Sequence, residues 1–146
     1  MSPDDIPLLF RHATPGLRRR ELGDFFRDAA RAIARGREVA CLITDDRELR
    51  QLNRKFRGKN YATDVLSFPH DLGGEIAISL DRARAQAAEH GHRAADEIRI
   101  LMLHGLLHLS GMDHEADSGE MARAEMRWRK KFGLPAGLIE RTERTA

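Results

Sequence analysis

The pattern of apolar and polar positions predicts four strands, all within the first 79 residues. Residues 39–44 form a continuous, partly β-branched apolar run of strand length, which favours a central strand. Residues 6–10 and 65–68 are shorter apolar runs, and we expect Pro69 to end the second of them. Polar and apolar residues alternate over 75–79. This alternation predicts a strand that pairs with 65–68 in a hairpin-like arrangement.

The same pattern predicts helices between and after the strands. Apolar residues recur at helical spacing over 18–35, which indicates an amphipathic helix. A second helix follows a cap at Thr44 or Asp45, and its predicted inner face consists of Leu49, Leu52 and Phe56. Further helices are predicted at 81–90, 94–110 and 115–132.

The order of these elements favours an α+β fold over a regular β/α alternation, because strands concentrate in the first half and helices in the second. We expect a small mixed sheet from the N-terminal half, packed with helices around a buried central helix that carries the metal-binding histidines. Residues 94–110 have hardly any polar side, so this helix should be buried all round and form the axis of the fold. At 146 residues the chain fits one domain, residues 1–146. The last residues, 138–146, are polar and we expect them to fray.

The amino-acid composition indicates the cell compartment and the kind of ligand to expect. The single cysteine, Cys41, lies in an apolar run and cannot form an intrachain disulfide, which fits a reducing compartment. The first residues carry acids where a signal peptide needs positive charge, and no apolar run approaches the roughly 20 residues of a membrane span. We therefore expect a soluble, cytoplasmic protein. The basic residues are mostly arginines, and those at 54–59 form a dense cluster suited to phosphate.

Three of the seven histidines fall within eleven residues, at His104, His108 and His114. His104 and His108 are four residues apart on the predicted apolar helix, so both can face one metal ion. Gly111 can end that helix and allow His114 to turn back toward the pair. A shared ion also supplies the partners that the flanking leucines cannot. This pattern predicts a metal site.

Three imidazoles favour one zinc ion over magnesium or calcium, and three protein ligands leave a position for water, as in catalytic zinc sites. Asp113 could be a fourth ligand, a carboxylate that orients an imidazole, or simply a turn residue near Gly111. The ligand spacing is also that of the metzincin proteases. However, Gly105 occupies the position of their catalytic glutamate, which makes peptide cleavage doubtful.

Several motifs occur in order along the chain: Leu52-Asn53, RGK at 57–59, TDVLSFP at 63–69, GEIAIS at 74–79, HGLLHLSGMDH at 104–114 and Glu120-Met121. In these motifs the sequence resembles the YbeY endoribonucleases, also called rRNA maturation factors. The resemblance runs from about residue 45 to 121, with Met112 where that family usually has tyrosine and Glu75 where it usually has aspartate. Neither departure removes a predicted metal ligand.

The resemblance implies a metal-dependent endoribonuclease that cleaves single-stranded RNA in rRNA maturation and ribosome quality control. It implies that the three histidines hold zinc and that Arg57 is essential. A guanidinium beside a metal can stabilise the charge that develops on a phosphate during cleavage. Lys59 could track the RNA backbone, and Thr63, Asp64 and Ser67 could line the cleft or hold the loop and strand in place.

Single-stranded RNA, above all rRNA, and the ribosome or its small subunit are the expected partners; neither a membrane nor DNA is expected. Two alternatives remain open at this point. One is a zinc peptidase, which the histidine spacing favours. The other is a nonenzymatic, rRNA-binding ribosome assembly factor in which the metal only stabilises the central helix.

Overall fold

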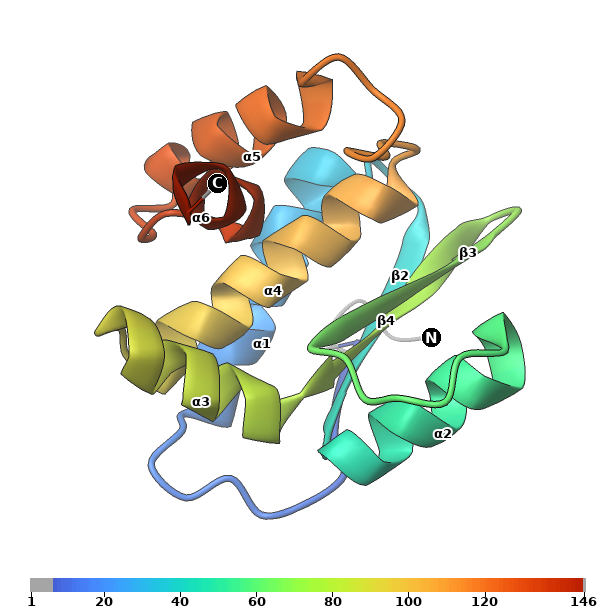
Figure 1. Cartoon of the computed structure of the whole chain (residues 1–146), viewed down its shortest axis with the longest axis vertical. Helices are drawn as coiled ribbons and strands as arrows, with labels where there is room; N and C mark the ends of the chain where they lie inside the picture. The colour runs from blue at the N-terminus through green and yellow to red at the C-terminus, as the bar shows by residue number, and fades with distance from the viewer. Residues whose placement is uncertain (1–6, 146) are drawn as a thin grey trace.

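The computed structural model describes residues 7–145, and their side chains as far as Arg141. Its sheet has the strand order β1-β2-β4-β3 (Figure 1). β2 pairs in parallel with both β1 and β4, while β3 is antiparallel to β4 at the edge of the sheet. The predicted hairpin and the small mixed sheet are therefore confirmed. The strands are β1 (Leu8–Phe10), β2 (Glu38–Thr44), β3 (Val65–His70) and β4 (Gly73–Ser79).

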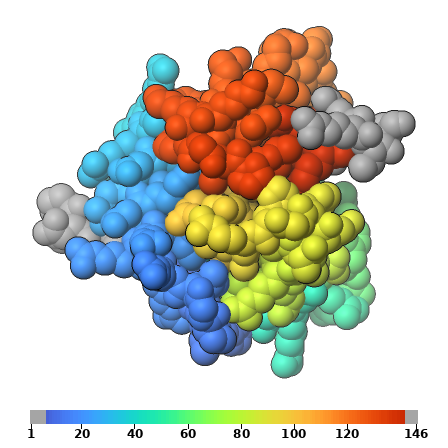
Figure 2. Space-filling view, turned by 90° about the vertical axis from the view of Figure 1, so that its left-hand side faces the viewer, coloured from blue at the N-terminus to red at the C-terminus, as the bar shows by residue number. Residues whose placement is uncertain are grey.

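Helices cover the two faces of the sheet unequally (Figure 1). α1 and α4 lie on one face with α5 and α6 beyond α4, whereas α2 lies on the other face. Figure 2 shows α1, α5 and the α3–α4 region next to one another on one side of the molecule. The helices are α1 (Arg19–Ile33), α2 (Asp46–Arg57), α3 (Leu80–His90), α4 (Ala94–Leu109), α5 (Glu120–Lys131) and α6 (Leu138–Thr145).

α4 is the predicted buried axis, and its burial confirms the α+β organisation. From Ile98 to Leu107 every residue except Arg99 is buried, and these side chains share one core with α1, β2 and β4. Cys41 is buried in this core, which raises the pKa of its thiol. No helix within residues 7–145 is long and apolar enough to cross a membrane.

Three boundaries differ from the prediction. Ile6, the first residue of the first predicted strand, lies outside the described residues. Pro69 does not end β3, which continues to His70, because an edge strand can hold a proline whose missing N–H would point outward. α5 starts at Glu120 and not at 115, because Asp117 accepts hydrogen bonds from the N–H groups of Gly119 and Met121 and holds the preceding residues in a turn.

One prediction about exposure is wrong. Helical spacing places Phe56 on the inner face of α2, but its side chain is 59% exposed, in edge-to-face contact with Phe68 of the sheet.

Residues 138–145, within the tail 138–146 whose fraying stays a prediction, form α6. Ile139 is buried, and Glu140 receives two hydrogen bonds from Arg129. An apolar anchor and a buried ion pair therefore hold this helix against the domain.

Candidate metal centre

The three predicted histidines converge at the end of α4. His104 and His108 lie one turn apart on the helix, and Gly111, with φ of +100°, lets the chain turn so that His114 faces them. Their ring centroids are 4.8 to 5.6 Å apart. One potential ligand atom from each ring lies within 4.8 Å of the other two. This group could hold a metal ion.

Hydrogen bonds orient two of the rings. The Met112 carbonyl lies 2.9 Å from His108 Nδ1 and can only accept, so this nitrogen carries the proton. His104 Nδ1 lies 2.9 Å from a carboxylate oxygen of Glu125 and donates to it in the same way. In both rings the unprotonated Nε2 is left for the metal. The donor set therefore fits a cation that accepts neutral nitrogen ligands.

Glu125 is the functional residue that the sequence analysis missed. Its side chain is fully buried, and it accepts one bond from His104 and one from the Ile139 N–H, at 2.9 Å each. It thereby joins α4, α5 and α6. A signal is present in the sequence: Glu125 follows the apolar Met121 by four residues in the predicted helix 115–132, so the two share a face. A carboxylate on such a face requires a buried partner.

The surroundings of His108 favour its neutral form. Burial lowers the pKa of His108, and the neighbouring His104 imidazole lowers it further, against a smaller opposing effect of the Met112 carbonyl. Protons therefore compete less for this ring at neutral pH than for an ordinary histidine. The site is prepared to bind a cation without first having to remove a proton from His108.

A cavity of about 490 Å³ joins the histidines to most of the other predicted site residues. Arg57, Thr63, Asp64 and Ser67 line it from one side and the three histidines from the other. Asp113 also lines the cavity, and its carboxylate accepts a bond from the Glu115 N–H at 3.1 Å. The described contacts thus show Asp113 in a turn, and the carboxylate bonded to a ligand histidine is Glu125. Lys59 is exposed and does not line the cavity.

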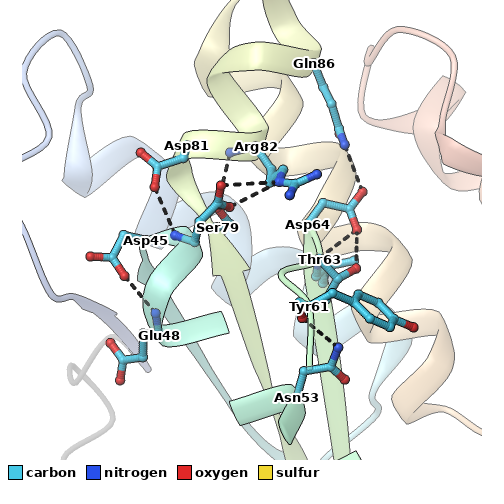
Figure 3. A network of polar contacts seen from close by, with 12 residues as sticks. Asp45, Glu48, Asn53, Tyr61, Thr63, Asp64, Ser79, Asp81, Arg82 and Gln86 are labelled. Atoms are coloured by element: carbon cyan, nitrogen blue, oxygen red, sulfur yellow. Dashed lines mark hydrogen bonds and ion pairs between the residues drawn. The ribbon is translucent and has the colours of Figure 1, made fainter. Parts of the chain in front are cut away.

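The loop that carries these residues is held in place from both ends (Figure 3). The buried Asn53 of α2 donates to the Tyr61 carbonyl at 3.0 Å. Asp64 accepts from the Val65 N–H at 2.8 Å and from Gln86 of α3 at 3.2 Å. Asp64 therefore ties the loop to both β3 and α3. This anchoring is one of the two roles that the sequence left open for it.

β3 presents an almost closed edge beside the cavity. The Ser79 N–H donates to the Asp64 carbonyl at 2.9 Å, so Asp64 and Ser79 form a hydrogen-bonded pair. Such pairs alternate along an antiparallel ladder, and the main-chain groups of Val65, Ser67 and Pro69 therefore point away from β4. Val65 donates its N–H to the Asp64 side chain, and proline has none. Among these three residues only Ser67 keeps an outward N–H. An added peptide strand would therefore find one main-chain donor over these three residues, beside their outward carbonyl acceptors.

Gly105 sets the distance between α4 and the sheet. A Cβ at this position would lie 2.9 Å from two side-chain atoms of Ile76 in β4. The Ser67 hydroxyl also reaches the Gly105 carbonyl, at 3.4 Å. A glutamate at 105 would therefore collide with the sheet. Gly105 therefore has two effects. It leaves the position of the peptidase glutamate without a carboxylate, and it permits the close packing that brings β3 to the histidines.

An α+β domain in which two histidines of the buried helix and a third from the turn after it converge, with an arginine lining the same cavity, is a protein equipped to hold a metal ion next to an anionic ligand. The sequence model described as Endoribonuclease YbeY matches residues 18–133. The chain belongs to the YbeY endoribonuclease family.

Individual relatives agree with this assignment. The protein called Endoribonuclease YbeY from Solibacter usitatus is 56% identical over 144 residues, covering 97% of this chain and 98% of its own. Its namesake from Koribacter versatilis is 46% identical over 142 residues, covering 95% and 93%. The solution structure of TM1509 from Thermotoga maritima is similar with a TM-score of 0.58 and 27% identity, over 83% of this chain and 84% of that one.

Proposed function

We propose that this protein is a zinc-dependent endoribonuclease that cleaves single-stranded RNA. The observation that carries the proposal is the shared cavity, in which Arg57 and Ser67 face the three histidines. The name of the family and of its members supports RNA as the substrate. Maturation and quality control of rRNA and contact with the small ribosomal subunit are the parts of the proposal that rest on family resemblance, and a cytoplasmic location is the part that rests on composition.

Zinc is the ion that best suits the donor set. Three neutral imidazole nitrogens match its preference, whereas magnesium and calcium prefer oxygen ligands. When bound, zinc would lower the pKa of a coordinated water and polarise a phosphate oxygen. His104, His108 and His114 would hold it, and Glu125 and the Met112 carbonyl would fix the orientation of the first two rings.

The remaining side chains act on the phosphate. The Arg57 guanidinium can bind two nonbridging oxygens and stabilise the negative charge that grows on them during cleavage. The outward N–H of Ser67 is a second donor beside the same cavity. Lys59, outside the cavity, is placed to attract the RNA backbone in a salt-dependent way. Thr63 and Asp64 complete the wall, with Asp64 holding the loop in position.

A peptidase fits the site less well, although the histidine spacing is that of metzincin proteases. Position 105 has no carboxylate and no room for one, because Ile76 lies against it. The neighbouring strand edge offers one free main-chain donor over Val65–Pro69, where a peptide substrate would need a ladder of them. Donors suited to a phosphate are present, and those suited to a peptide are largely blocked.

The test is cleavage of a labelled single-stranded RNA by zinc-loaded wild type and by variants with measured metal content. Arg57→Ala should lower the rate at least 100-fold, as expected when a donor to the transition state is removed, and His114→Ala should do the same because it removes a metal ligand. Arg31→Ala, an exposed arginine in the last turn of α1, is the matched control and should retain full activity.

Two outcomes would overturn the proposal. If the wild type binds RNA but cleaves none, the protein is an assembly factor and not a nuclease. If it degrades an unfolded protein and His108→Ala abolishes that activity, it is a peptidase. Equal cleavage by wild type and Arg57→Ala would remove Arg57 from the mechanism while leaving the metal site intact.

A further inference from the structure

A second hollow, of about 700 Å³, lies on the α2 side of the sheet. Leu52 and Phe56 of α2, Phe68 of β3 and Leu9 of β1 contribute apolar side chains to it. Leu9 and Phe56 are both more than half exposed. α2 covers only part of this face of the sheet. Large apolar side chains that stay exposed around a hollow indicate a binding surface.

The hollow is continuous with the candidate metal centre. Arg57, Ser67 and Pro69 line both cavities. Successive side chains of a strand point to opposite faces, so Ser67 is directed to the α4 side and Phe68 to the α2 side. The two cavities therefore meet across the edge strand β3, at Arg57. A ligand with a phosphate at Arg57 can extend from one cavity into the other.

Aromatic rings and positive charge occur together at this junction. Phe56 and Phe68 are in edge-to-face contact, with ring centroids 5.4 Å apart, and the Lys55 ammonium lies 5.2 Å from the Phe56 centroid. Arg54, Lys55 and Arg57 form the basic last turn of α2, and none of them has an acidic partner within the described part of the chain. Nucleic-acid sites for single strands combine these two features.

The hollow also carries a negative charge. Glu75 lines it beside Phe68, its cross-strand partner, with one carboxylate oxygen 3.7 Å from the ring of His70. A phosphate would be repelled by this carboxylate, whereas the exocyclic amino group of a base could donate to it. The charge distribution thus places phosphates near Arg57 and bases in the apolar hollow. This favours RNA over an aliphatic protein segment, which would use neither group.

We propose that this hollow is the subsite for the nucleotides next to the scissile phosphate, with a base stacked on Phe56 and Phe68. The subsite rests on the proposed endoribonuclease function and gives it a means of recognising single strands. A base in a duplex is already stacked on its neighbours and cannot enter, whereas an unpaired base can be splayed onto an aromatic ring.

The first experiment measures binding of a fluorescein-labelled single-stranded RNA decamer by anisotropy, with zinc-loaded protein and, in parallel, with EDTA to stop cleavage. Phe56→Ala should weaken binding about 5- to 10-fold, the lower part of the range for loss of one stacked base. Phe56→Tyr should restore binding and Phe56→Leu should not. Leu72→Ala is the control, because Leu72 is an exposed apolar residue that does not line the hollow.

A second experiment changes the RNA and compares wild type with Phe56→Ala. It uses a set of decamers, each with one abasic nucleotide. At one position, removal of the base should weaken binding to wild type by the same factor as Phe56→Ala weakens binding of intact RNA. Removal of that base should not weaken binding to Phe56→Ala any further. Equal affinity of wild type and Phe56→Ala for intact RNA, or additive losses in this set, would overturn the subsite. Because these assays measure binding, they remain decisive whether or not the RNA is cleaved, so failure of the subsite is distinct from failure of the proposed function.

Discussion

Replacing Glu125 with glutamine should weaken zinc binding about 10- to 100-fold, the usual effect of altering a group that orients a metal ligand. Both oxygens of the buried carboxylate accept hydrogen bonds, one from His104 Nδ1 and one from the Ile139 N–H, each at 2.9 Å. Glutamine has the same shape but only one acceptor oxygen. Its amide N–H₂ must therefore face one of the two donors.

The size of the effect follows from these two contacts. A 10- to 100-fold loss of affinity corresponds to about 1.4–2.8 kcal/mol. A buried donor without an acceptor also lowers the free energy of unfolding of the metal-free protein by about 1–3 kcal/mol. A typical domain has about 5–15 kcal/mol of stability, so the Glu125→Gln protein should remain folded and measurable at 25 °C.

Zinc affinity is measured by competition with a chromophoric chelator, and circular dichroism checks the fold of each variant. Glu89→Gln is the matched control, since it makes the same chemical change at an exposed position of α3 and should bind zinc as the wild type does. A folded Glu125→Gln protein with wild-type affinity would refute the inference that Glu125 orients His104 for the metal.

Three further results are expected. Zinc at about 100 times its Kd should raise the free energy of unfolding by about 2.7 kcal/mol in denaturant titrations, and His114→Ala should reduce this gain sharply. Gly105→Ala should lower stability by about 1 kcal/mol, because crowding against Ile76 outweighs the better helix propensity of alanine, and Ile76→Val should relieve part of that loss. A hydrogen bond from Arg11 lowers the pKa of Glu48, so the ionised carboxylate stabilises the fold. Wild type should exceed Glu48→Gln in the free energy of unfolding by on the order of 0.2–1 kcal/mol above about pH 4.5. This difference should vanish as the pH falls through the lowered pKa of Glu48.

Features set by local spacing could be predicted from the sequence. The histidine pair on α4 and the return of His114 after Gly111 depend on helix periodicity and one glycine, both of which are readable in eleven residues. The buried α4 and the strands of the sheet followed from runs of apolar residues. In these elements tertiary contacts reinforce the local preference and do not reverse it.

Features set by contacts between distant segments could not be placed in advance. Glu125 and His104 are brought together by the packing of α5 on α4, and the sequence shows only that a carboxylate lies on an inner face. The exposure of Phe56 has a similar origin. Helical periodicity directs it inward, but the sheet beneath that end of α2 does not cover it. Periodicity determines which side chains share a face and leaves open what that face meets.

The close approach of α4 to the sheet links the metal centre to both proposed RNA contacts. Because Gly105 has no side chain, α4 can pack against Ile76 while the Ser67 hydroxyl reaches the Gly105 carbonyl. His104 and His108 are on α4 and Ser67 is on the strand that separates the two cavities, so this distance determines how far the metal lies from Arg57 and from the apolar hollow. Any side chain at 105 would move both phosphate donors away from the metal. Cleavage should therefore be more sensitive to this position than zinc affinity, which depends on α4, the turn after it and Glu125 of α5.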